Sequence, residues 1–401
     1  MSVLPYRIFP RSSALRFLPL LLLTLLVSCG ESTDKPAEAE AVTRITEQQS
    51  REFAQRLESS INARDPEFTN AAVDLESMFK TITRDLSVTD KDFQEFMAEV
   101  PPGFSFGNQL VKAMENEGVF RLINFRWDGG KPKALYRMII GDGLFTYYDL
   151  YLGERADSQV TIRDVYIYVT GELFTEAVRR VIMTDQSGPL RRLFAAATGT
   201  GVGLAEATDS IKNYTRNGQY REALDYYEKL PAEMKDNKTV QIVRMAASQK
   251  LGDAEYEKTL EDISRRFSGN SSMDLVLLDH YTFKKQHDST RVVIDRLDRS
   301  LGGDPYLNFA RASVDIQQNM LAPAREKLLK VVAYDSTLIA PHWALVNVAL
   351  KQQDHAETAR LLNVIEEKLG ISISPDAVAA DTTYANFARS DAFKTWADAR
   401  Q

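Results

Sequence analysis

Residues 217–227 read Asn-Gly-Gln-Tyr-Arg-Glu-Ala-Leu-Asp-Tyr-Tyr, and this stretch decides the fold of the C-terminal half of the chain. Asn217-Gly218 is a turn signal, and the apolar and small residues after it recur at helical spacing. Leu251-Gly252-Asp253 repeats the turn after an interval of about 34 residues. Three further turn signals continue the series, at Gln286-His287-Asp288, near Asn319 and near Gln353. A repeat of this length predicts helix pairs that stack on one another, because one pair cannot bury its apolar face alone.

The pattern resembles the tetratricopeptide repeat, a helix-turn-helix unit of about 34 residues. The resemblance covers residues 204–370 and is strongest in the first unit, whereas the register of the second and third units stays open. It implies an all-α solenoid whose concave face binds a peptide or protein. The tail, residues 371–401, ends in a segment rich in aromatic residues, which predicts a helix that caps the last repeat. These aromatic residues are Tyr384, Phe387, Phe393 and Trp396.

A ladder of cations precedes the predicted turns. Arg216, Lys250, Lys284 and Lys351 each stand two residues before a turn, and Gln317 takes the fourth position. In the resembled family this part of the first helix contributes to the concave groove, which Lys212, Trp343 and Asn347 would also face. Such a ladder suits an acidic peptide or a C-terminal carboxylate. The alternative is helix-dipole compensation, which favours a cation at a helix C-terminus by about 0.3–1 kcal/mol.

Residues 44–185 predict an α+β domain. Helical periodicity runs over 44–63, 68–86 and from Asp90 onward. Four runs of period 2 follow, joined by Gly-rich turn signals, and then another helical segment begins after Glu172. This order predicts an antiparallel sheet with helices, loosely similar to nuclear-transport-factor-2-like or cystatin-like folds. The predicted strands are 119–127, 133–140, 144–152 and 160–169.

No catalytic or cofactor-binding constellation emerges from this domain. Gly103-Phe104-Ser105-Phe106-Gly107 matches the G-x-S-x-G nucleophile elbow, but Pro101-Pro102 is a poor strand and no histidine occurs before His280. We therefore interpret Ser105 as a loop residue. The four histidines lack metal-site spacing, and the glycines of the 186–203 linker do not follow a strand. A surface rich in tyrosine leaves a ligand pocket open as an alternative to ordinary packing; it comprises Tyr147, Tyr148, Tyr151, Tyr166 and Tyr168.

The N-terminal segment, residues 1–28, reads as a signal peptide. Three arginines precede an apolar run from Phe17 to Val27, which is too short to span a membrane. The run ends in Leu26-Val27-Ser28-Cys29, which resembles the lipobox of bacterial lipoproteins. This resemblance implies cleavage before Cys29 and attachment of fatty acyl chains, such as palmitate, to its thiol. Cys29 is the only cysteine of the chain, so the mature protein can form no internal disulfide.

Charge and composition restrict the partners. Residues 29–43 lack large apolar side chains and predict a flexible tether. Removal of the signal peptide takes away three positive charges, so the formal net charge falls from −7 to −10. An acidic chain argues against nucleic acid as a partner. The residue after the cysteine is Gly30 and not aspartate, and in the lipoproteins of Gram-negative bacteria that the chain resembles this implies the outer membrane.

Two hypotheses follow for function. The first is a non-catalytic scaffold lipoprotein of the cell envelope that binds an unknown protein or acidic peptide in the repeat groove. The second is an α+β domain that binds a small molecule, or an undetected enzyme, with the repeats serving oligomerisation. A narrower resemblance to repeat lipoproteins of outer-membrane assembly is opposed by the α+β domain between anchor and repeats. None of these hypotheses requires a cofactor or a metal.

Overall fold

The computed structural model describes residues 45–84, 88–99, 105–114, 118–128, 130–140, 144–155, 157–184, 204–267 and 270–400. Within these ranges the chain forms two compact units, one ending at His280 and one beginning at Tyr281. The first contains a sheet with helices and then further helices, and the second is entirely helical. The predicted order of an antiparallel α+β region and an all-helical region is thereby confirmed. The signal peptide, Cys29, the tether and the 186–203 linker lie outside the described residues.

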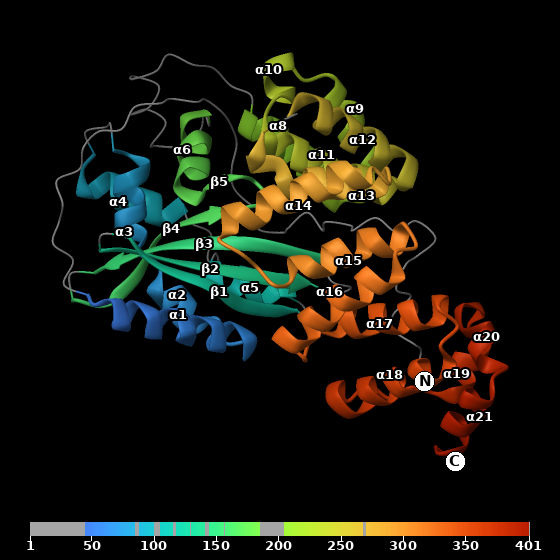
Figure 1. The fold of residues 1–401 in the computed structure, drawn as a ribbon. Coiled ribbons are helices and arrows are strands. Elements are labelled where there is room, and N and C mark those ends of the chain that lie inside the picture. Colours follow the sequence, from blue (N-terminus) through green and yellow to red (C-terminus); the bar gives the residue numbers. More distant parts are fainter. Residues whose placement is uncertain are drawn as a thin grey trace. The chain divides into compact units, whose positions relative to one another are not determined.

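The sheet is a five-stranded antiparallel meander in the order β1-β2-β3-β4-β5 (Figure 1). Its four long strands coincide with the four predicted runs to within a few residues, because alternating aromatic and β-branched residues fit a pleated sheet. The sequence pattern does not predict β5, whose two residues pair with the end of β4. The strands are β1 (Val119–Asp128), β2 (Lys131–Ile140), β3 (Leu144–Glu154), β4 (Val160–Ile167) and β5 (Glu172–Leu173).

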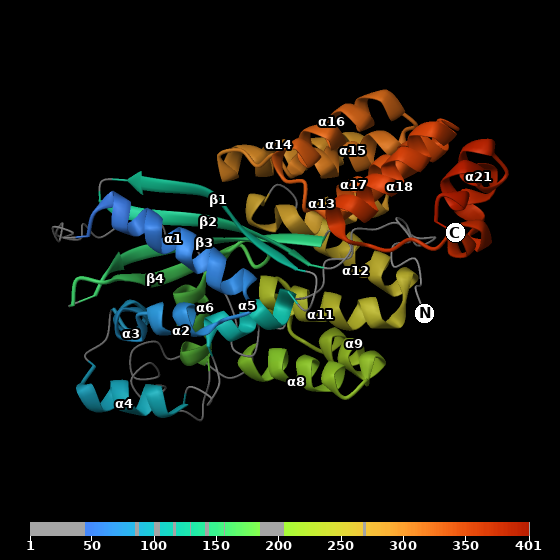
Figure 2. The ribbon, with the colours of Figure 1, turned by 90° about the horizontal axis from the view of Figure 1, so that it is seen from below.

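Helix α1 (Glu47–Asn62) packs across one face of this sheet (Figures 1 and 2). Leu57 and Ile61 of α1 are completely buried. The rings of Phe120 and Tyr136 stack with 4.6 Å between their centroids. The Tyr136 hydroxyl donates a hydrogen bond of 2.9 Å to the Ala54 carbonyl oxygen of α1. The helix is thus joined to the sheet both by apolar burial and by a buried hydrogen bond.

The predicted helix over residues 68–86 is wrong in one respect, because the chain forms two helices there. These are α2 (Glu67–Ala72) and α3 (Leu75–Ile82). Between them Val73 makes a β-bridge with Ile162 of β4, and the Asp74 side chain accepts a hydrogen bond from the Ser77 amide at the start of α3. An aspartate that caps a helix start competes with helix continuation. The other helices of this region are α4 (Asp90–Glu99), α5 (Phe106–Met114) and α6 (Phe174–Thr184).

The helical region contains five successive helix pairs within its described residues. In the first two pairs, α8, α9 and α11 share a core around Ile211, Ala223, Tyr227 and Val243. The short helix α10 (Ala232–Lys235) lies between these pairs in the chain. The pairs are α8 (Leu204–Arg216) with α9 (Tyr220–Glu228), α11 (Lys238–Leu251) with α12 (Asp253–Arg266), α13 (Asp274–Phe283) with α14 (His287–Leu301), α15 (Leu307–Gln317) with α16 (Leu321–Tyr334), and α17 (Ile339–Lys351) with α18 (His355–Leu369).

Each pair turns at a residue with positive φ. These residues are Gly218, Gly252, Lys285, Asn319 and Gln353, so the turn recurs at a nearly constant interval of about 34 residues. The amide that follows Gly218 bonds back to the Tyr214 carbonyl oxygen at 2.8 Å, and equivalent bonds follow the last three turns. A left-handed residue with such a bond ends a helix and satisfies its free carbonyl groups. The predicted turn positions are therefore confirmed, including the two that the sequence indicates only loosely.

The boundary between the two compact units falls within α13, whereas the sequence pattern suggests a boundary in the 186–203 linker. A contact inside the first unit joins the sheet to the segment before α13. A methyl group on Gly171, at the turn before β5, would overlap the Ser272 carbonyl oxygen just before α13. The turn before β5 and the segment before α13 thus lie so close that a side chain larger than glycine does not fit between their backbones.

The C-terminal tail packs on α18, as the sequence predicts. Tyr384, Phe387 and Trp396 are buried, and Phe387 lies 5.4 Å from Phe393 between ring centroids. Arg400 stacks over Trp396 and pairs with Glu366 of α18. The tail consists of α19 (Pro375–Ala380), a short 3-10 helix (Thr382–Tyr384), α20 (Ala385–Ala388) and α21 (Asp391–Asp398).

Candidate functional site

The predicted cation ladder lies at the ends of the first helices of the pairs. Arg216, Lys250 and Lys351 are each in the last turn of their helix and have exposed side chains. None of the three forms an ion pair with another residue that the structure describes. Helices α8 and α11, which carry Arg216 and Lys250, pack against each other. These two cations therefore belong to adjacent helices of one compact unit.

The other predicted groove residues are less accessible. Lys284 follows α13 and is half-buried, and Lys212 on α8 is also half-buried; both already interact with other groups of the chain. Gln317 ends α15 and is half-buried. The exposed members of the ladder are therefore Arg216 and Lys250 in the first unit and Lys351 in the second.

Trp343 does not lie on an open surface. Only 1% of this residue is exposed, and it is among the largest fully buried side chains of the described chain. Asn347, one turn later on α17, is half-buried. The apolar spacing of α17 explains the difference, since nearly every residue from Pro341 to Ala349 is buried. Trp343 thus contributes to the helix core, and only Lys351 of this helix presents an exposed charged group.

Ser105 stands at the start of α5, immediately before Phe106, and so lies at a helix start rather than in a free loop. Its carbonyl oxygen accepts the Gln109 amide at 3.1 Å. The Ser105 hydroxyl is buried and has no hydrogen-bond partner among the described residues, so no base activates it there. The structure gives the nucleophile-elbow motif no catalytic geometry in the part of the chain that it describes.

Gly107, the last residue of that motif, has a packing role. A Cβ atom there would lie 2.5 Å from the Pro66 carbonyl oxygen and 2.7 Å from Oδ1 of Asn70. The Gly107 amide donates a hydrogen bond of 2.8 Å to the same Oδ1. Glycine therefore allows α5 to approach the start of α2.

We expect Gly107→Ala to destabilise the N-terminal domain by about 1–2 kcal/mol. Alanine improves helix propensity by about 1 kcal/mol, but overpacking against a backbone oxygen costs about 1–3 kcal/mol or more. Urea unfolding followed by circular dichroism measures the change, and hydrogen exchange of peptides from α2 and α5 locates it. Lys112→Ala, at an exposed position of the same helix, is the control and should leave the midpoint nearly unchanged. A Gly107→Ala protein as stable as the wild type would contradict the packing role.

The five tyrosines of the sheet divide between its two faces. Tyr148 is completely buried beneath the helices, with its ring edge-on to Phe106. The strand register places Tyr147, Tyr151, Tyr166 and Tyr168 on the opposite face. There, Tyr147 and Tyr166 each contact Tyr168 edge-on, at 5.7 and 5.1 Å between ring centroids. The single tyrosine-rich surface predicted from the sequence is therefore wrong, because consecutive strand residues such as Tyr147 and Tyr148 point to opposite faces.

Charged groups accompany the four tyrosines of that face. Arg126 of β1 pairs with Asp149 of β3, whose side chain is only 8% exposed. Lys133 lies 4.1 Å above the Tyr151 ring. Burial, together with the nearby Asp149 carboxylate, raises the pKa of the Tyr168 hydroxyl above its ordinary value. Tyr168 therefore stays neutral at neutral pH, as an ordinary tyrosine does, and the raised pKa reflects its burial among the other tyrosines.

One other perturbed group of the sheet has a structural role. Burial raises the pKa of the Asp164 carboxyl, although hydrogen bonds from the Thr175 side chain and amide oppose this. Thr175 lies in the first turn of α6, so Asp164 satisfies one of the free amides of that helix start. A perturbed carboxyl is often functional, but this one is explained by its contacts.

The histidines do not form a metal site in the described part of the chain. His342 is buried, and its Nδ1 lies 2.8 Å from the Leu338 carbonyl oxygen one turn earlier. Across the described ranges, no group of three or more metal-ligating side chains gathers. Among the helices that the structure describes, none combines the length and the apolar character that a membrane span requires.

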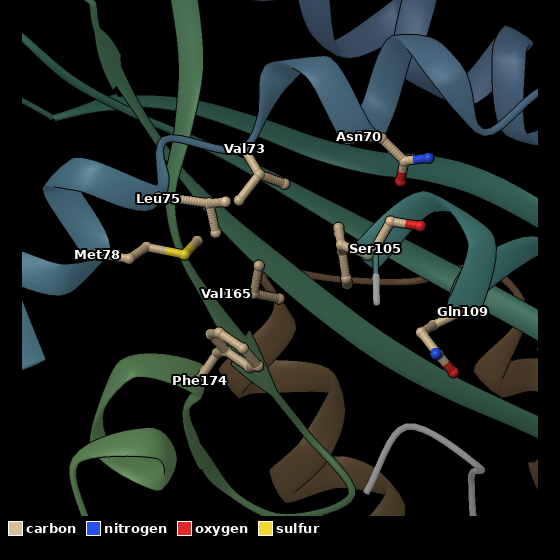
Figure 3. A pocket seen from close by; sticks show the side chains of 9 residues that line it. Asn70, Val73, Leu75, Met78, Ser105, Gln109, Val165 and Phe174 are labelled. Atoms are coloured by element: carbon tan, nitrogen blue, oxygen red, sulfur yellow. The ribbon is translucent and has the colours of Figure 1, made fainter. Parts of the chain in front are cut away.

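Two depressions occur in the N-terminal domain. A shallow groove of about 570 Å³ runs between α1, α2 and the turn after β3, and Phe53, Phe68 and Arg56 line part of it. The Arg56 guanidinium lies 4.2 Å above the Phe68 ring. The second depression is a smaller cavity beside Ser105 (Figure 3). Its lining comes from separate elements, so the sequence contains no motif that could have indicated it.

Comparison with known proteins gives no match for this chain: no family model, no curated protein and no solved structure matches it.

Proposed function

We propose that this chain is a non-catalytic, lipid-anchored interaction protein of the bacterial cell envelope. Its helix pairs form a tetratricopeptide-type array that binds an acidic peptide or protein. The observation that carries the proposal is the regular series of left-handed turns from Gly218 to Gln353. Exposed cations stand just before three of those turns. Helix pairs repeated at this period commonly present a binding surface built from equivalent positions of successive units.

The packing order supports the repeat interpretation. The first helix of one pair packs against the first helix of the next, as α8 does against α11 and α15 against α17. The second helix of a pair also contacts the following pair, as α9 does with α11 and α16 with α17. Small side chains permit this approach, since Ala223 and Ala324 are completely buried. Such neighbour-to-neighbour packing is typical of solenoids.

The charge of the ladder supports an acidic partner. The chain carries a formal net charge of −7, so its own surface repels a generally acidic molecule. Charges at the surface are screened beyond about 10 Å, so an acidic molecule close to a local group of cations is little affected by the more distant negative charges. The local group therefore attracts it. Arg216 and Lys250 make no ion pair with described residues, which leaves their donors available. The lipobox resemblance at Cys29 supports the location in the envelope.

Charge reversal at the three exposed ladder positions tests the proposal. We expect Arg216→Glu, Lys250→Glu and Lys351→Glu together to weaken binding of an acidic peptide at least about tenfold, because charge-assisted hydrogen bonds are lost and repulsion replaces them. Fluorescence anisotropy with a labelled oligoglutamate probe measures affinity. Crosslinked capture from envelope fractions then identifies the natural partner.

Cations at the ends of the second helices provide a matched control. Lys229 follows α9, whereas Arg299 and Lys368 lie in the last turns of α14 and α18, and all three are exposed. Their reversal to glutamate changes the net charge and the helix-dipole interaction by a similar amount. If both triple variants bind the probe equally, the ladder only compensates helix dipoles and the proposed groove is refuted.

A further inference from the structure

A cavity of about 80 Å³ lies in the N-terminal domain where α2, α3, α5, β4 and α6 meet (Figure 3). One wall is apolar and holds the Met78 side chain of α3 and the first residue of α6, Phe174. The Phe174 ring and Val165 of β4 lie on the same side of the cavity in Figure 3. Val73 and Leu75 complete this wall.

The other wall carries neutral polar groups from Asn70, Ser105 and Gln109. The Ser105 hydroxyl is buried without a hydrogen-bond partner among the described residues. The Gln109 side chain also forms no hydrogen bond with the described chain. The Asn70 side chain already has partners, because its Oδ1 accepts the Gly107 amide and its Nδ2 donates to Oδ1 of Asn108. A buried hydroxyl without a partner is unfavourable in an apo protein, since it has lost water and gained nothing.

The two-sided lining distinguishes this cavity from a packing defect. Empty cavities in proteins are lined by apolar groups throughout, whereas buried waters need two to four polar partners each. Here the polar groups occupy one side and cannot surround a cluster of waters that would fill the space. The described residues of the lining contain no charged side chain, so they would give a buried charged ligand no counter-ion. The lining thus fits a molecule with one apolar and one hydrogen-bonding part.

We propose that this cavity binds a small neutral amphiphile, an aliphatic group that carries a hydroxyl or amide. The aliphatic part contacts Met78, Val165 and Phe174, and the polar part exchanges hydrogen bonds with Ser105 and Gln109. A water molecule takes about 30 Å³ in the liquid, so a cavity of about 80 Å³ admits an aliphatic group of about three, or at most four, carbon atoms. The Phe106 ring, which also lines the cavity, rests edge-on against buried Tyr148 and is thereby fixed. This site is independent of the cation ladder.

Titration of the full chain with 1-butanol and butyramide tests the site. The Met78 methyl group lines the cavity and provides a local reporter when the methionine methyls carry ¹³C. We expect a saturable shift of the Met78 resonance with both probes and none with butylammonium or butyrate. Ser105→Ala should lower the affinity for 1-butanol about five- to tenfold, which corresponds to the loss of one hydrogen bond. The affinity for 1-chlorobutane should stay unchanged. A Met78→Leu spectrum assigns the resonance.

Two variants keep the test decisive. Ser60→Ala removes another buried hydroxyl that has no partner but does not line the cavity, and it should not affect binding. Leu75→Phe adds volume to the apolar wall and should abolish the shift with every probe, while circular dichroism confirms the fold. The absence of a saturable Met78 shift in the wild type would overturn the proposal. Equal 1-butanol affinity in Ser105→Ala and wild type would equally refute the assigned hydrogen bond.

Discussion

Cys29→Ala is expected to abolish acylation of the chain completely. The lipobox resemblance makes the Cys29 thiol the acceptor of the fatty acyl chains, and the sequence contains no second cysteine to replace it. Two or more acyl chains hold a protein stably at a membrane, because each buried methylene contributes about 0.8 kcal/mol. Loss of the thiol therefore removes the whole anchor. Labelling of cells with an alkyne-tagged fatty acid measures acylation directly.

Membrane attachment through the acyl chains must be distinguished from attachment through an uncleaved signal peptide. An unprocessed Cys29→Ala chain keeps residues 1–28 and their apolar run, so membrane sedimentation alone would mislead, and the intact mass must be measured as well. A chain exported with a conventional cleavable signal and starting at Gly30 should appear in the soluble fraction. Ser28→Ala keeps a small residue before the cysteine and should retain the label. Persistent labelling of Cys29→Ala would show that the anchor is elsewhere.

Asp262→Ala is expected to destabilise the first helix pairs by about 3–5 kcal/mol. Arg244 of α11 donates a hydrogen bond of 2.6 Å to the Asp262 carboxylate of α12, and the two side chains are only 6% and 12% exposed. The Arg244 guanidinium also lies 4.1 Å above the Tyr227 ring. Without the carboxylate, a buried guanidinium loses its counter-ion, which costs far more than loss of an exposed pair.

Urea unfolding, with hydrogen exchange of peptides from residues 238–266, measures this loss. Asp391→Ala removes the exposed partner of Lys394 and is the control, because its pair lies entirely at the surface. Its unfolding midpoint should match that of the wild type. If Asp262→Ala has the same unfolding midpoint as this control, the ion pair between Arg244 and Asp262 does not contribute to stability, and the prediction is wrong.

The same pair predicts a dependence on pH. Burial alone would raise the pKa of the Asp262 carboxyl, but hydrogen bonds from Arg244, Arg266 and Arg265 outweigh it and hold the pKa well below its usual value. A carboxyl with a lowered pKa stabilises the folded state above its unfolded pKa of about 3.9, and this contribution is lost as pH falls toward the folded pKa. The difference between wild type and Asp262→Ala should therefore be constant near neutral pH and shrink below about pH 4.

Local sequence patterns predict a strand or a turn well where interactions between residues close in the chain are enough to form it. The four long strands follow from alternation, and the turns follow from Gly or Asn at a fixed period. The turns at Lys285 and Gln353 are harder to predict from the sequence, because neither residue favours positive φ. Only their distance from Gly218 and Gly252 indicated them. The break between α2 and α3 was missed, since it depends on the bridge between Val73 and Ile162.

The candidate sites were predictable only in part. Periodicity placed Arg216, Lys250 and Lys351 at helix ends, and these side chains are exposed. It also suggested Trp343 as a groove residue, yet Trp343 is buried. A helix with apolar residues on most of its surface does not reveal which face meets the core. Asn70, Ser105 and Gln109 gave no signal as a set, because they come together only when α2 packs against α5.

By itself, the sequence determined the order of the α+β and helical regions and the positions of the turns, because strand alternation, helix spacing and turn chemistry act over a few residues. The lipobox at Cys29 is likewise a local signal, and it stays a prediction here. Only the tertiary structure decided which cations remain exposed, that Gly107 serves packing, and that Asp262 neutralises Arg244. Those properties depend on what each side chain meets after folding, and packing brings together residues that no local pattern relates.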